Sequence, residues 1–195
     1  SAEEVKVTPA GGKDVTPSTD QKYVYLTAKV DEANGVYGTD TEKSDKYGLL
    51  YMDVANSSSG WGGVHVNEYD GGTSTNKGEL SMNVDGARKV FAQGLSANTD
   101  ATLTFDLSGI KAERFEGYVG IDYTKSTKTN RDGANFIFYK DSISEENKLA
   151  ESGVILQPDN AKLMNVDLTG VEKLIIYIDK VGGKNDDCVD IADAK

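Results

Sequence analysis

The chain has 195 residues, of which 21 are Lys or Arg and 32 are Asp or Glu, so its formal net charge is −11 at pH 7 with the single His neutral. This length predicts one domain with a short appendage, since a chain of roughly 150 residues already buries about two-thirds of its unfolded surface. The negative charge would repel a phosphate backbone, which argues against nucleic acid and anionic membrane as partners and favours neutral or cationic ligands. No apolar run approaches the roughly 18 residues of a membrane span, so no membrane insertion is expected.

The composition favours strands and offers little catalytic chemistry. The chain contains 21 Gly and 10 Tyr but only 3 Pro, which is typical of a turn-rich β protein. Its only cysteine, Cys188, excludes an internal disulfide and is expected to be a small buried residue. Nucleophilic catalysis would have to use the only histidine, His65, and no G-x-S-x-G motif is present. Zinc is not expected either, because it favours several Cys and His ligands.

The predicted elements begin after a polar segment. Residues 1–22 show no hydrophobic period and contain two of the three Pro, so we expect a linker or a loosely held arm. Because the chain starts at Ser1 without a signal peptide, we also expect it to be cut from a longer protein. A single domain is predicted over residues 23–195. It opens with strands at 23–30 and 49–54, separated by a long loop rich in Gly and Asp.

Alternation of apolar and polar residues is clearest in the second half. In ATLTFDL, residues 101–107, every second residue is apolar, which is the period of a half-buried strand. The same pattern predicts strands at 115–121, 135–139, 164–168 and 173–178. Five such strands joined by short turns predict an antiparallel β-sandwich. Only residues 142–152 have a helical character, and we expect one or two helical turns there.

Several segments, taken in chain order, resemble a known family. They are SSGWGG (58–63), GARKVFAQGLSANTDATLTFDLSG (86–109), FEGYVGID (115–122), ESGVILQPDNAKLMNVDLTGVEKLIIYI (151–178) and DDCVDIADAK (186–195). Together they are similar to NPCBM, the novel putative carbohydrate-binding module, also classed as carbohydrate-binding module family 51. The resemblance covers roughly residues 47–195 and leaves residues 23–47 as an extension.

The resemblance implies an all-β fold, a jelly-roll-like antiparallel β-sandwich of the galactose-binding type. It also implies a non-catalytic module that holds a parent glycoside hydrolase near galactose-terminated glycans of the blood-group or mucin type. The module would be secreted or at the cell surface of a bacterium, with the parent enzyme domains in cis and a structural calcium ion. We also expect the chain to be a monomer. Intrinsic hydrolysis is not expected, because glycosidases need a deep cleft and generally a larger scaffold.

Three positions depart from the family pattern. Asn98 and Cys188 stand where the family keeps a His, and Ile191 stands where it keeps a Trp. These departures leave a second hypothesis open. The chain would then be a structural or adhesive β-sandwich module of a bacterial surface protein, without sugar binding.

Trp61 is the first candidate for sugar binding. It is the only Trp and lies between glycines, where an exposed ring could pack on the apolar face of a sugar. The alternative is a Trp folded inward over the end of the sandwich. His65, Asn67 and Glu68 follow closely and offer donors and acceptors for sugar hydroxyls.

Two further residues are candidates for the sugar site. Arg131 lies in a loop between two predicted strands, where its guanidinium could donate two parallel hydrogen bonds to neighbouring hydroxyls; the alternative is a solvated loop Arg. Asn98 is carried over by the resemblance, because it takes the place of the family His.

Calcium requires six to eight oxygen ligands, several of them from a tight loop. Asp70 precedes two glycines in the loop at 67–76, which has a suitable composition. The resemblance implies Asp193 as the carboxylate that closes the shell, with Asp190 as second choice. The alternative is that these carboxylates are simply solvated.

Overall fold

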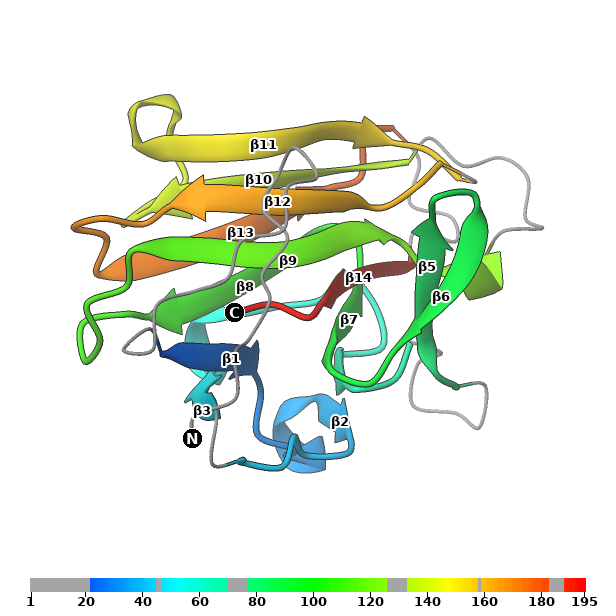
Figure 1. Ribbon diagram of the computed structural model, residues 1–195, viewed down its shortest axis with the longest axis horizontal. Helices are drawn as coiled ribbons and strands as arrows, with labels where there is room; N and C mark the ends of the chain where they lie inside the picture. The colour runs from blue at the N-terminus through cyan, green and yellow to red at the C-terminus, as the bar shows by residue number, and fades with distance from the viewer. Residues whose placement is uncertain (1–21, 45–46, 70–76, 126–132, 158, 183–187) are drawn as a thin grey trace, which may run out of the picture.

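The protein is described by a computed structural model that covers residues 22–44, 47–69, 77–125, 133–157, 159–182 and 188–195. Two large sheets face each other and form a β-sandwich (Figure 1). The predicted linker at residues 1–22 lies almost entirely outside the described residues. No helix among the described residues is long and apolar enough to span a bilayer.

The first sheet has six strands and the second has four. In spatial order, the first contains β12 (Lys162–Asp167), β9 (Arg114–Ile121), β14 (Cys188–Ala192), β7 (Gly94–Asn98), β4 (Val64–Val66) and β2 (Val36–Gly38). The second contains β11 (Lys148–Ile155), β10 (Ala134–Lys140), β13 (Lys173–Asp179) and β8 (Ala101–Asp106). Neighbouring strands are antiparallel, except that β2 pairs in parallel with β4.

The predicted alternation builds the core between the sheets. Inward-facing side chains of β8, β9, β10 and β13 are fully buried, among them Phe105, Phe115, Phe136, Phe138, Leu174 and Ile176. Phe115 from the first sheet meets Phe138 from the second, with ring centroids 5.0 Å apart. Burial of this face supplies most of the driving force for bringing the sheets together. The all-β sandwich is thus confirmed.

The helical prediction for residues 142–152 is wrong for most of its length. A single 3₁₀ turn, η4 (Glu145–Asn147), is present, and the chain then enters the edge strand β11. Pairing of β11 with β10 satisfies the backbone of this segment and outweighs its local helical preference.

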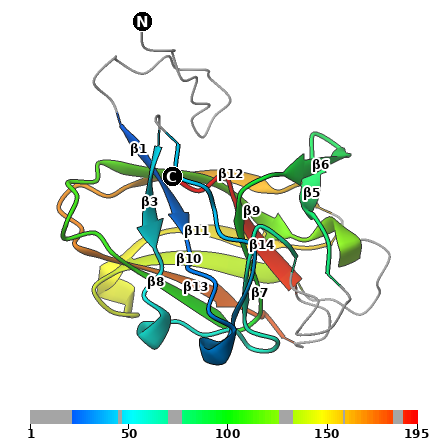
Figure 2. The ribbon, with the colours of Figure 1, turned by 90° about the horizontal axis from the view of Figure 1, so that it is seen from below.

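Two small sheets flank the sandwich. The hairpin of β5 (Leu80–Val84) and β6 (Ala87–Phe91) packs Leu80, Met82 and Phe91 against Ala192 of the six-stranded sheet. β1 (Tyr23–Thr27) pairs in parallel with β3 (Tyr47–Tyr51), and Figure 2 shows the two side by side.

The extension before residue 47 is part of the packed structure. Leu26 and Val36 belong to the main core, and the Leu26 N–H donates to the Ala194 carbonyl at 2.9 Å. β2 lies within the segment that the sequence predicts as a long loop. Gly38 allows β2 to approach β4 closely. Its φ is 106°, and a Cβ at this position would lie only 2.2 Å from the Val66 oxygen. The extension therefore supplies the edge strand of the six-stranded sheet.

The structure predicts that the extension contributes to stability. Leu26→Ala removes a side chain that is 5% exposed and should lower the free energy of unfolding by about 2–5 kcal/mol. Urea denaturation measures this, with Val154→Ala on β11 as a control, because Val154 is 49% exposed. Equal midpoints for the two variants would show that the extension does not share the core.

Candidate functional site

Trp61 lies at the tip of the loop between η2 (Val54–Asn56) and β4 and is 63% exposed. The backbone around it is fixed by the neighbouring strand end. The Gly60 N–H donates to the Asn98 carbonyl at 2.9 Å, and the Ser59 hydroxyl donates to the Trp61 carbonyl at 2.8 Å. The Asn98 amide donates to the same Trp61 carbonyl at 3.3 Å. The indole is therefore presented to solvent from an ordered backbone.

Gly60 shows how tightly this loop packs. An added Cβ at Gly60 would lie 2.2 Å from the Thr99 carbonyl oxygen, so only glycine fits. The structure thus brings together two of the predicted site residues, Trp61 and Asn98. In this contact Asn98 supports the backbone that carries the indole.

His65 of β4 is buried and pairs with the partly exposed Glu68. His65 is 1% exposed, and its Nδ1 lies 2.8 Å from Glu68 Oε1 while its Nε2 lies 3.1 Å from the Gly62 carbonyl oxygen. Both partners present an oxygen atom to a ring nitrogen of His65. Tyr37 of β2 packs on the imidazole with ring centroids 5.2 Å apart. In these contacts His65 supports the Trp61 loop through Gly62.

Asn67 forms hydrogen bonds to two other backbone segments, at Gly94 and at Thr39. Its N–H donates to the Gly94 carbonyl at 2.9 Å, and its side-chain oxygen accepts from the Gly94 N–H at 3.0 Å. Its amide donates to the Thr39 carbonyl at 2.9 Å. These bonds join β4, β7 and the extension at the opposite end of β7 from Asn98.

Asp193 is remote from Trp61. Its N–H donates to the Gln93 carbonyl at 3.0 Å, and Gln93 immediately precedes β7, five residues from Asn98, which corresponds to roughly 17 Å of extended chain. Burial raises the pKa of Asp193, and the ammonium groups of Lys195 and Lys89 oppose that increase.

Only part of the predicted calcium site lies within the described residues. None of them forms a group of three or more His, Cys, Asp or Glu side chains that could hold a metal. Asp190 is fully buried in β14. Asp70 and Arg131, two of the predicted site residues, lie outside the described residues, so their predicted roles stay predictions.

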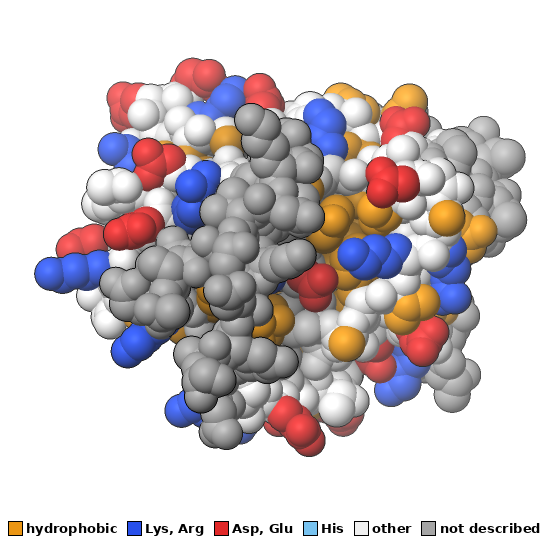
Figure 3. Space-filling model, viewed as in Figure 1, with side chains coloured by type: hydrophobic (Ala, Val, Ile, Leu, Met, Phe, Trp, Pro, Cys, Tyr) orange, Lys and Arg blue, Asp and Glu red, His pale blue; other side chains and the backbone are white. Residues whose placement is uncertain are grey.

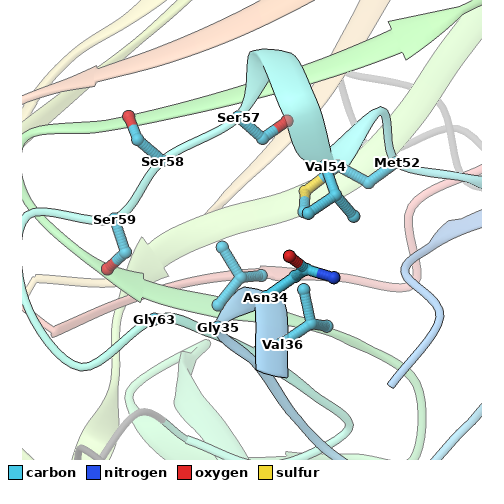
Figure 4. Close-up of a pocket in the computed structure, with 10 residues that line it drawn as sticks. Asn34, Gly35, Val36, Met52, Val54, Ser57, Ser58, Ser59 and Gly63 are labelled. Atoms are coloured by element: carbon cyan, nitrogen blue, oxygen red, sulfur yellow. The ribbon is translucent and has the colours of Figure 1, made fainter. Parts of the chain in front are cut away.

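A pocket of about 220 Å³ lies beside the Trp61 loop (Figure 4). Its walls come from η1 (Glu32–Asn34), the start of β2, η2 and both ends of the loop that carries Trp61. Figure 2 shows η1 and η2 at the same end of the molecule. The lining residues fall into an apolar group, Val36, Met52, Val54 and Val64, and a polar group, Asn34, Ser57, Ser58 and Ser59.

This pocket could not be predicted from the sequence. The Asn34-Gly35 dipeptide is a turn signal, but no local rule places that turn against the Trp61 loop 25 residues later. The contact depends on the parallel pairing of β2 with β4 and on the Val64 N–H, which donates to the Gly35 carbonyl at 3.0 Å.

Comparisons with solved structures support the fold. A carbohydrate-binding module, CBM51, of Clostridium perfringens GH95 in complex with methyl-galactose matches with a TM-score of 0.61 and 19% identity, over 71% of this chain and 90% of that one. CBM51-2 of Clostridium perfringens ZmpB, in complex with GlcNAc and with INT domains, matches with a TM-score of 0.62 and 21% identity, over 76% of this chain and 32% of that one.

Another structural match consists of more than one module. The tandem CBM51 modules of Sp3GH98, a family 98 glycoside hydrolase from Streptococcus pneumoniae, match with a TM-score of 0.60 and 19% identity, over 74% of this chain and 44% of that one. At these identities the likeness shows the fold alone. No curated protein matches the chain.

The family comparison covers most of the chain. The family model described as the NPCBM/NEW2 domain matches residues 46–195, which include the Trp61 loop, the six-stranded sheet apart from β2, and the whole four-stranded sheet. The carbohydrate-binding family that the sequence resembles is thereby confirmed. The chain belongs to the NPCBM/NEW2 domain family.

Proposed function

We propose that this chain is a non-catalytic carbohydrate-binding module that binds a neutral glycan on the indole of Trp61. The observation that supports this most directly is the 63% exposure of a large aromatic side chain on a loop whose backbone is fixed by hydrogen bonds to Ser59 and Asn98. A sugar presents an apolar face of C–H groups that packs on an aromatic ring, and a rigid platform loses little conformational entropy on binding.

The proposed ligand is a galactose-terminated glycan of the blood-group or mucin type. The complex of a structural neighbour with methyl-galactose supports this choice. An uncharged ligand also suits a chain with a net charge of −11. Figure 3 shows acidic and basic side chains interspersed over the described part of one face, without the continuous basic area that a polyanion would need.

We further propose that the module works in cis with a parent glycoside hydrolase, at the surface of or outside a bacterial cell. Modules of this type occur in larger enzymes among the structural neighbours; a match to Clostridium perfringens ZmpB, which includes an M60 catalytic domain, covers only 17% of that chain. A weakly binding module on a tether raises the local concentration of its enzyme without new chemistry.

A structural or adhesive role without sugar binding is the second candidate. Two of the residues that depart from the family pattern are built into the interior, since Cys188 is fully buried and Ile191 is 3% exposed in the main core. These two side chains are therefore not available to a ligand at the surface. The absence of binding to any glycan would favour this second role.

Replacing Trp61 tests the proposed platform. Trp61→Ala should abolish measurable binding of a galactose-terminated oligosaccharide in calorimetry and leave the thermal midpoint within about 1 °C, because an exposed side chain contributes little to stability. Leu156→Ala, at a side chain that is 44% exposed, is the matched control and should bind normally. Unchanged affinity in Trp61→Ala would refute the platform.

Replacing His65 tests its support of the loop. His65→Ala leaves the partly buried Glu68 carboxylate and the Gly62 carbonyl without their imidazole partner, so the free energy of unfolding should fall by about 1–3 kcal/mol. The freed loop should also make Trp61 emission easier to quench with acrylamide. Glu68→Gln keeps an acceptor for the imidazole and should give a smaller change in both measurements. Wild-type quenching in His65→Ala would contradict the supporting role.

Calcium is tested separately from the sugar. If the ion binds the folded chain as the resemblance implies, removing it with EDTA should lower the melting temperature, because a ligand that binds only the native state stabilises it. Asp70→Asn and Asp193→Asn should each remove the difference between metal-free and calcium-loaded samples. Identical melting curves with and without calcium in the parent chain would remove the metal from this account.

A further inference from the structure

The pocket between η1 and η2 adds a feature that sugar stacking on Trp61 does not use. We infer that this pocket holds the N-acetyl group of an N-acetylated sugar whose ring packs on Trp61, and that the extension thereby sets the preferred sugar. The inference rests on the proposed sugar binding. Its first support is position, because the pocket residues Ser59 and Gly63 lie on either side of Trp61 in the same loop.

The size of the pocket suits a substituent better than a chain of sugars. Its volume of about 220 Å³ lies below the ~300–1,000 Å³ of sites that enclose a drug-sized ligand. One group of a ligand can enter while the sugar ring stays outside on the indole. The pocket therefore fits a single small substituent.

The lining suits a methyl group. Val36, Met52, Val54 and Val64 place apolar side chains on several sides of the pocket, and Figure 4 shows Val54 and Met52 across the gap from Val36. A hydroxyl in such surroundings would lose hydrogen bonds to water, whereas a methyl group gains by leaving water. An N-acetyl substituent brings such a methyl, and the hydroxyl of an unmodified sugar does not.

Asn34 offers the matching polar group. Its side-chain nitrogen donates to Asp31 Oδ2 at 2.6 Å, which fixes the orientation of the amide. Its side-chain oxygen then points into the gap below Val54 (Figure 4). An amide N–H of the ligand can donate to this oxygen.

The turn at Gly35 and the strand that starts at Val64, which form two walls of the pocket, are fixed relative to each other. The Val64 N–H donates to the Gly35 carbonyl at 3.0 Å, so the turn after η1 is bonded to the strand that follows the Trp61 loop. Gly63 has a φ of 77°, and an added Cβ would lie 2.4 Å from the Gly35 oxygen. Most of the pocket belongs to the matched family region, but Asn34, Gly35 and Val36 precede residue 46, where the match begins.

Pairs of sugars that differ only at C2 test the inference. Calorimetry should compare methyl N-acetylgalactosaminide with methyl galactoside, and methyl N-acetylglucosaminide with methyl glucoside. We expect the N-acetylated member of at least one pair to bind about tenfold more tightly, through one buried methyl group and one hydrogen bond.

Two variants locate the effect. Val54→Phe should fill the pocket and remove the preference for the N-acetylated sugar, while binding of the unmodified sugar to Trp61 is retained. Asn34→Ala should reduce the preference for the N-acetylated sugar, because it removes the hydrogen-bond acceptor. Val154→Phe on β11 makes the same chemical change at an exposed site and should alter nothing. In the parent chain, methyl NMR signals of Val36, Val54 and Val64 should shift with the N-acetylated sugar and not with its partner, which tests the site even if Val54→Phe fails to fold.

The possible failures are distinguishable. Equal affinity within both pairs, or an equal loss for both sugars in Val54→Phe, would overturn the N-acetyl pocket and leave the Trp61 platform intact. No binding of any of the four sugars, together with no binding to an array of galactose-terminated glycans, would overturn the proposed function and this inference with it.

Discussion

The arrangement of the site depends on close backbone contacts around the loop that carries Trp61. Thr99 lies against Gly60, the imidazole of His65 contacts the Gly62 carbonyl, and Gly35 lies against Gly63. Glycine at 60 and 63 makes the approach possible, because a Cβ at either position would overlap a carbonyl oxygen. With its backbone held in this way, the loop turns the indole outward and closes one side of the pocket.

The long strands of the sandwich core can be predicted from local sequence, whereas the short and edge strands cannot. Alternation in β8, β9, β10, β12 and β13 is long enough to show which residues face inward, and burial of those residues defines the two layers. β2 and β4 have three residues each, too few to show a period; β2 forms by pairing with β4, and β4 by pairing with β7. β11 has helix-like residues but completes an open sheet edge. Tertiary pairing, which local sequence does not encode, decides these cases.

The site was predictable to a similar degree. The single Trp between glycines indicated a loop, yet sequence left open whether the ring faced out or in, because Trp is highly buried on average. His65 and Asn67 have the right chemistry for sugar hydroxyls. Their hydrogen bonds go instead to Glu68, Gly62 and Gly94, contacts that depend on how β4 lies against β7. The position of Asn34 in the pocket could not be predicted either, because Asn34 precedes residue 46, where the family match begins.

The most direct test of the account uses the intrinsic fluorescence of Trp61, the only Trp of the chain. Titration with a galactose-terminated or N-acetylated oligosaccharide should shift its emission and protect it from iodide or acrylamide quenching, with saturation at the dissociation constant found by calorimetry. Binding seen by calorimetry without any change in emission or quenching would place the sugar elsewhere on the molecule and contradict the central role of this loop.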